Sequence, residues 1–145
     1  MMLSEDIIAA ARAEIDTPFR HQGRTPGRAL DCAGLMIVIA KRIGAETCDS
    51  TSYARRPSSA LLETALDIQP CLTRIALDAV EPGDILLMKF YGDPQHLAIF
   101  AGRSDVYQDD GIIHAWAQAR KVCEHRLTPE WRARIVRAYR FTEAA

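Results

Sequence analysis

A cysteine at the expected start of a helix is the side chain in this sequence best suited to nucleophilic chemistry. Cys32 follows Asp31, which can cap a helix by accepting a backbone N–H, and it precedes the apolar run 35–40. A helix N-terminus stabilises an anion, so this position favours loss of the thiol proton and predicts alkylation of Cys32 at unusually low pH. The alternative is a buried cysteine that packs as a small apolar side chain.

Nucleophilic catalysis by a thiol also needs an imidazole base and a third group that orients this base. His96 begins an expected strand directly after a turn, where an imidazole can be held rigidly beside a cleft. His114 lies within a second expected strand, and its side chain points away from those of its two neighbours. If the two strands are adjacent, the two imidazoles come within hydrogen-bonding reach; otherwise each is an ordinary turn, core or surface histidine.

The other two histidines give weaker indications. His21 lies in a loop before Cys32 and could line the cleft, whereas His125 alternates with Cys123 as a surface residue would. A zinc site is the competing arrangement, because zinc-ligand side chains occur among the candidate residues Cys32, His96, His114, Cys123 and His125. Only Cys123 and His125 form a close pair in the sequence, so we expect no metal and no cofactor.

The elements that must position these residues follow from local patterns. An amphipathic helix is expected over 4–16, and a helix over 32–43 should end at Gly44. Asp109, Asp110 and Gly111 form a turn signal, and Gly102 should end the strand that His96 begins. Strands are expected at 71–76, 85–90, 96–101, 112–116, 121–127 and 135–141. Helices first and antiparallel strands second indicate an α+β fold, and we expect a single domain over 1–145.

Composition excludes several classes of function. The chain has 145 residues, 48% hydrophobic and 26% charged, with a net charge of -1. This charge argues against electrostatic binding of nucleic acid or of an anionic membrane. Four cysteines are too few for a disulfide scaffold, so reduced thiols are expected. No apolar run is long enough to span a membrane and no signal peptide pattern is present, so we expect synthesis in the cytoplasm.

Five short motifs resemble, in the same order, those of the NlpC-type cell-wall peptidases, a bacterial branch of the papain-like cysteine peptidases. Asp31-Cys32-Ala33-Gly34-Leu35 resembles the Asp-Cys-Ser-Gly-Leu/Phe motif of that family. The other four are 18–23 (Pro-Tyr-x-x-Gly-Gly in the family), 82–86 (Pro-Gly-Asp-Leu), 96–102 (His-Val-Gly-Ile-Tyr-x-Gly) and 113–115 (Ile-His-Ala).

The resemblance implies a papain-like core, with N-terminal helices packed on an antiparallel sheet and the nucleophile at a helix N-terminus. Cys32 would be the nucleophile, His96 the general base and acid, and His114 the residue that holds the imidazole. The backbone N–H of Cys32 would be one oxyanion donor. Substrate-binding positions implied by the motifs are Phe19, His21, Gln22, Asp31 and Ala33.

This sequence departs from the family pattern at two of these positions. Phe19 stands where the family has a tyrosine, so a hydroxyl near the nucleophile is missing, and His21 or Gln22 could substitute for it. Ala33 replaces the usual serine after the cysteine, which we interpret as a packing change.

The implied reaction is amide hydrolysis through a thioester, at the D-Glu–diamino acid bond of peptidoglycan stem peptides. Small stand-alone relatives resemble components encoded with phage tails and gene transfer agents. Phage-like tail proteins are therefore expected partners, and such a particle would deliver the enzyme to the cell wall or periplasm. The alternatives are a weak or inactive structural or binding component of a tail tip, an amide acyltransferase on the same scaffold, and a zinc hydrolase.

Overall fold

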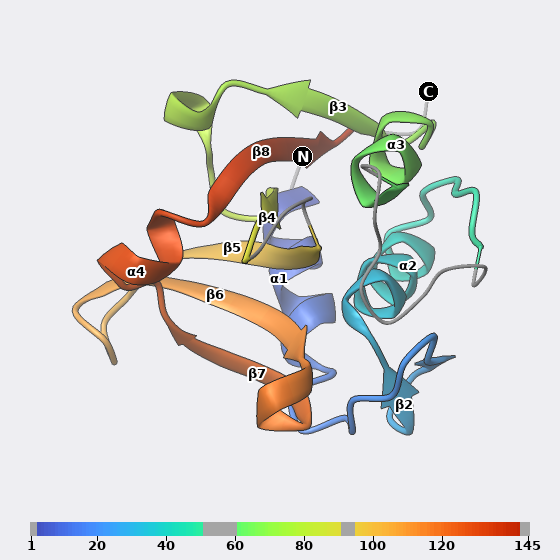
Figure 1. The fold of residues 1–145 in the computed structure, drawn as a ribbon, viewed down its shortest axis with the longest axis horizontal. Helices are drawn as coiled ribbons and strands as arrows, with labels where there is room; N and C mark the ends of the chain where they lie inside the picture. Colours follow the sequence, from blue (N-terminus) through green and yellow to red (C-terminus); the bar gives the residue numbers. More distant parts are fainter. Residues whose placement is uncertain (1–2, 51–60, 91–94, 143–145) are drawn as a thin grey trace.

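The structure, a computed structural model, describes residues 3–50, 61–90 and 95–142 (Figure 1). The helices are α1 (Leu3–Arg12), α2 (Cys32–Arg42), α3 (Leu61–Asp67) and α4 (Pro129–Arg132), with short 3-10 turns at Leu77–Ala79 and Ala117–Ala119. The strands are β1 (Arg24–Thr25), β2 (Ala29–Leu30), β3 (Leu72–Ile75), β4 (Ile85–Met88), β5 (His96–Ser104), β6 (Asp109–Trp116), β7 (Lys121–Arg126) and β8 (Ile135–Phe141). The expected α+β class is confirmed.

Six strands form one antiparallel sheet in the order β3-β8-β4-β5-β6-β7. Apolar side chains cover both faces of this sheet. Strand β4 shows this, because it is buried along its whole length and its successive side chains point to opposite faces. Ile85 and Leu87 belong to the core shared with α1 and α2, whereas Leu86 and Met88 belong to a smaller core that includes Trp131 of α4. Figure 1 accordingly shows α2 and α3 on one side of the sheet and α4 on the other.

Helix α2 is the central buried element. Asp31 is its N-cap and accepts a 2.7 Å hydrogen bond from the backbone N–H of Gly34. Every residue from Gly34 to Ala40 is buried, so burial of apolar surface rather than an amphipathic pattern holds this helix in place. The helix is followed by Gly44 at φ +75, as its role as a stop signal predicts.

The first turn of α2 packs directly on the preceding loop. A Cβ atom on Gly34 would lie 2.0 Å from the carbonyl oxygen of Gly23. Gly23 is equally confined, since its own Cβ would lie 2.7 Å from the backbone of Ala29 and Leu30. The two glycines of the motifs therefore let the loop and the helix start approach more closely than side chains would allow.

Three expected boundaries are wrong. Helix α1 ends at Arg12 rather than 16, because the backbone N–H of Asp16 leaves the helix and donates to the carbonyl of Val122 on β7. Strand β5 continues through Gly102, which has φ +75 and accommodates a register shift instead of ending the strand. Asp109–Gly111 is strand rather than turn, because Gly102 pairs with Gly111 and Ser104 with Asp109.

Among the described residues, no helix combines the length and the apolar character needed to cross a lipid bilayer.

Substitution Gly34→Ala should lower the free energy of unfolding by about 2 kcal/mol or more, because the new methyl group overlaps the Gly23 carbonyl. Gly44→Ala is the matched control: nothing lies within 4 Å of its Cβ position, so only backbone strain of about 1 kcal/mol is expected. Urea unfolding measures both. Equal losses in the two variants would contradict the close-approach explanation.

Candidate active site

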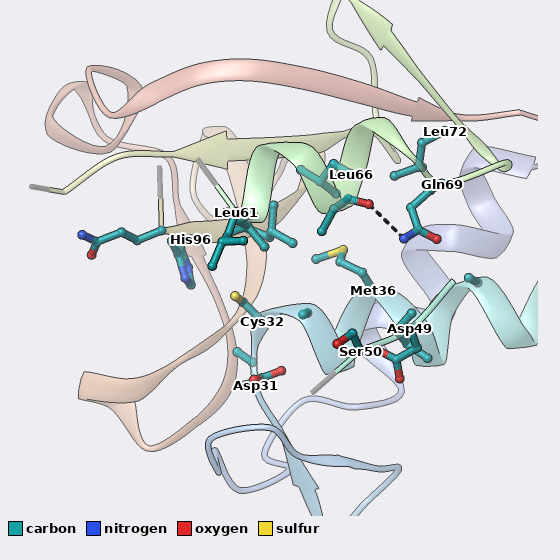
Figure 2. A pocket seen from close by; sticks show the side chains of 18 of the residues that line it. Asp31, Cys32, Met36, Asp49, Ser50, Leu61, Leu66, Gln69, Leu72 and His96 are labelled. Carbon is teal, nitrogen blue, oxygen red and sulfur yellow. Dashed lines mark hydrogen bonds between the residues drawn. The ribbon is translucent and has the colours of Figure 1, made fainter. Parts of the chain in front are cut away.

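Cys32, the first residue of α2, lies at one end of a pocket of about 800 Å³. His96, the first residue of β5, lines the same end, and Figure 2 shows its ring and the Cys32 sulfur projecting toward one another. From there the pocket runs between α2 and α3 along apolar side chains that include Met36 and Leu66. The far end is polar: the Gln69 amide donates to the carbonyls of Ala65 and Cys48.

The histidine side chains of the sheet form a hydrogen-bonded row. His96 Nε2 lies 2.6 Å from His114 Nδ1, so the two imidazoles are within hydrogen-bonding reach, as expected for adjacent strands. His114 Nε2 lies 2.8 Å from His125 Nε2, and His125 Nδ1 donates to the carbonyl of Arg126 at 2.9 Å. His96 and His114 are both buried, whereas His125 is partly exposed.

Aromatic side chains surround this row. The Trp131 ring centroid lies 5.1 Å from those of both His114 and His125, and Trp116 stacks on His114 at 5.5 Å. Phe90 packs against His96 and Trp131 at 5.6 Å. Both tryptophans thus pack against the histidines, and this packing excludes water from the ring faces of the histidines.

Asp31 connects the helix start to the loop before it. Besides capping α2, its carboxylate accepts from the backbone N–H of Gln22 and from the Arg24 guanidinium, both at 2.9 Å. Arg24 also binds Asp49 at 3.0 Å. The buried Asp31 carboxylate is therefore satisfied on both oxygens, which fixes the position of the adjacent Cys32.

Four of the five residues expected to bind substrate line the pocket: Phe19, His21, Asp31 and Ala33. Gln22 does not. It sits at φ 62 and uses its backbone N–H to hold Asp31, so its contribution in this structure is to the loop.

The expectation of an acidic Cys32 thiol is wrong. Burial raises the pKa of this thiol to about 12, and the Asp31 carboxylate acts in the same direction. Backbone hydrogen bonds from Leu97 and Ala33 and the Arg24 cation oppose the rise without cancelling it. The helix terminus is thus outweighed by desolvation, an effect that local sequence does not reveal.

The buried histidines His96 and His114 also favour their neutral forms, because their pKa values are lowered. Burial lowers the pKa of His96 to about 3, and positive charge on His125 or Arg134 lowers it further. Burial likewise lowers the pKa of His114 to about 2, with His96 and His125 acting in the same direction. Burial therefore favours the neutral form of the thiol and of both imidazoles.

Sequence inspection missed the role of His125, which was expected to be a surface residue. It occupies the same face of β7 as Cys123, which pairs with His114 in the sheet. Side chains of the zinc-ligand type do gather here, since ligand atoms of His114, Cys123 and His125 lie within 4.8 Å of one another. The ring nitrogens of the two histidines are hydrogen-bonded to each other, so a metal ion would have to replace that bond.

A model of the NlpC/P60 family matches residues 16–140. The fold is similar to an NlpC/P60 family protein from Bacillus cereus ATCC 10987, with TM-score 0.70 and 19% identity over 97% of this chain and 40% of that one. It is also similar to the NlpC/p60 domain of peptidoglycan hydrolase SagA, with TM-score 0.60 and 23% identity over 93% and 96% of the two chains.

An N-acetylmuramoyl-L-alanine amidase from Bacteroides uniformis ATCC 8492 gives TM-score 0.67 and 11% identity, over 99% of this chain and 100% of that one. The present chain thus spans the whole of some similar structures but less than half of the Bacillus cereus protein. A search of curated proteins found no significant match.

Alkylation of Cys32 by iodoacetamide should rise continuously with pH and show no plateau below about pH 7, because burial keeps this thiol protonated. Asp31→Asn should increase the rate at any given pH, since it removes a negative charge that raises the pKa. Mass spectrometry of each labelled cysteine provides the measurement, with exposed Cys48 as internal reference. A plateau of Cys32 reactivity in acid would show a preformed thiolate instead.

Folding stability should fall as pH is lowered below about 6.5, the value for an unfolded histidine. Below that pH the unfolded chain binds protons that buried His96 and His114 do not, so each contributes a slope of up to about 1.4 kcal/mol per pH unit. His96→Gln should reduce the slope of unfolding free energy against pH by the contribution of one histidine. Denaturant unfolding between pH 7.5 and 5 tests this, and an unchanged slope in the variant would contradict it.

Proposed function

The chain belongs to the NlpC/P60 family, and we propose on that basis that it is a cysteine peptidase that hydrolyses amide bonds of peptidoglycan stem peptides. The observation that carries this proposal is the arrangement at one end of the pocket. There Cys32 at a helix start meets His96, whose Nε2 is bound to His114 at 2.6 Å. Nucleophile, base and orienting group are the three components that thiol-based acyl transfer needs.

The first chemical step forms a thioester. His96 Nδ1 takes the proton from the Cys32 sulfur while the sulfur attacks the carbonyl carbon of the scissile amide. The developing oxyanion lies near the backbone N–H of Cys32, which belongs to the first turn of α2 and has no carbonyl partner within the helix. When the C–N bond breaks, the departing amine takes the proton from His96.

The second step uses water. His96, again neutral, removes a proton from a water molecule that attacks the thioester carbonyl. The C–S bond then breaks, the acid product leaves, and the sulfur recovers a proton from His96. His114 holds the His96 ring throughout, because its Nδ1 binds the Nε2 of that ring.

The substrate assignment is supported by two proteins of similar structure, a peptidoglycan hydrolase and an N-acetylmuramoyl-L-alanine amidase. Within the stem peptide we place cleavage at the D-Glu–diamino acid bond. Phe19, His21 and Ala33 line the same pocket as Cys32, and we expect them to contact the peptide. Delivery to the cell wall by a phage-like particle, with tail proteins as partners, remains part of the proposal.

Cys32→Ala should abolish release of stem-peptide fragments from purified cell walls, a loss of at least about a thousandfold, because no other group supplies the nucleophile. Cys123→Ala is the matched control and should retain activity within about twofold, since its sulfur takes no part in thioester chemistry. Chromatography of the soluble fragments with mass spectrometry measures both and identifies the bond cut.

Other outcomes identify the rival functions. Loss of activity in Cys123→Ala together with bound metal would indicate a zinc hydrolase. Wall binding without hydrolysis by the unmodified protein would indicate a structural or binding component. Transfer of the acyl group to an added amine, with little hydrolysis, would indicate an amide acyltransferase.

A further inference from the structure

We propose that His125 is a positioning residue that fixes which ring nitrogens of His96 and His114 carry hydrogen, and so keeps Nδ1 of His96 free to accept a proton. The hydrogen-bonding role stands on the geometry of the three histidines. Its catalytic consequence rests on the proposed function.

The three rings follow one diagonal line across adjacent strands. In the β6–β7 register Ile112 pairs with His125 and His114 pairs with Cys123, so His125 is the diagonal neighbour of His114 on the same sheet face. Continued from the pair Ile99–Ile113, the β5–β6 register puts His114 opposite Ala98, and His96, two residues before Ala98, is then in the same diagonal relation to His114. Each ring thus contacts the next through one pair of nitrogens, at 2.6 Å and 2.8 Å.

The row ends at a group that can only accept. The Arg126 carbonyl oxygen lies 2.9 Å from His125 Nδ1, so this nitrogen must carry the hydrogen. A neutral His125 then has a lone pair at Nε2, and His114 must donate from its own Nε2. His114 Nδ1 consequently accepts, His96 donates from Nε2, and the remaining lone pair of the row lies on His96 Nδ1.

The reverse direction of donation requires an additional proton. If Nε2 of His125 donated, that ring would be an imidazolium, and His96 Nδ1 would carry a hydrogen and be unable to act as a base. Trp116 and Trp131 cover the rings of His114 and His125, so water does not compete for these nitrogens from the ring faces. The aromatic enclosure therefore makes the carbonyl of Arg126 the group that sets the direction.

The histidine tautomers can be measured without any substrate. In ¹⁵N-histidine NMR spectra of the chelator-treated protein at about pH 7.5, His125 should carry its hydrogen on Nδ1, because this nitrogen faces the Arg126 carbonyl. His96 and His114 should carry theirs on Nε2. A doubly protonated His125, or a hydrogen on Nδ1 of His96, would overturn the proposal.

Two amide substitutions separate the two nitrogens of His125. The amide of His125→Gln reaches the position of Nε2 and can accept from His114, whereas the shorter amide of His125→Asn reaches the position of Nδ1 and can serve only the Arg126 carbonyl. In His125→Gln the Arg126 carbonyl no longer sets the direction, because the Gln amide can accept from His114 or donate to it, so His96 and His114 should each divide between the two tautomers. In His125→Asn a substantial fraction of both should move their hydrogen to Nδ1.

Activity should follow the same order. We expect kcat/KM to fall in both variants, by about threefold in His125→Gln, which keeps a partner for His114, and by about tenfold or more in His125→Asn, mainly through kcat, as for other residues that orient a reacting side chain. Tautomers that stay as in the unmodified protein in both variants would overturn the proposal, even if both variants were less active. The expected tautomers in an unmodified protein that cleaves no wall peptide would support the histidine row and refute only the proposed function.

Discussion

A 2.6 Å hydrogen bond between two buried imidazoles, His96 and His114, is the interaction on which the candidate site depends. Each ring has one nitrogen that would otherwise be a buried polar atom without a partner, at a cost of about 1–3 kcal/mol. Burial also holds both rings neutral. The pair can therefore be satisfied only by one donor and one acceptor, and this requirement links the geometry of the rings to their chemistry.

A single irregularity in the sheet makes this pair possible. Beyond the bulge at Phe100–Gly102, Gly102 pairs with Gly111, whereas before it Ile99 pairs with Ile113. Without that one-residue shift His114 would lie opposite Ile99, whose side chain belongs to the core shared with α1 and α2. The positive φ of Gly102 thus places His114 on the same sheet face as His96.

Local patterns and the family resemblance together predicted Cys32, His96 and His114 as the site, and the structure places Cys32 and His96 on one pocket and binds His96 to His114, but no pattern predicted their electrostatic state. The Asp31 cap, the apolar run after Gly34 and the glycine stop correctly predicted α2, because each acts within one helical turn. His125 was missed because its contact with His114 depends on the β6–β7 register, and no local pattern specifies register. The thiol pKa was misjudged because burial depends on the packing of distant segments around Cys32.

Asp31 has two opposed effects, on helix capping and on the pKa of Cys32, and Arg24 binds its carboxylate. Asp31 is needed to cap α2, yet its charge raises the pKa of the neighbouring thiol and opposes the thiolate that catalysis requires. Arg24 donates to that carboxylate and lowers the pKa of Cys32, so the cap is retained with less cost to the nucleophile. Because the thiol and both imidazoles favour their neutral forms, the proposed mechanism has charge arise by proton transfer from Cys32 to His96 in one event. A separated thiolate or imidazolium would be a buried unpaired charge, whereas the pair formed together is opposite in sign and close in space.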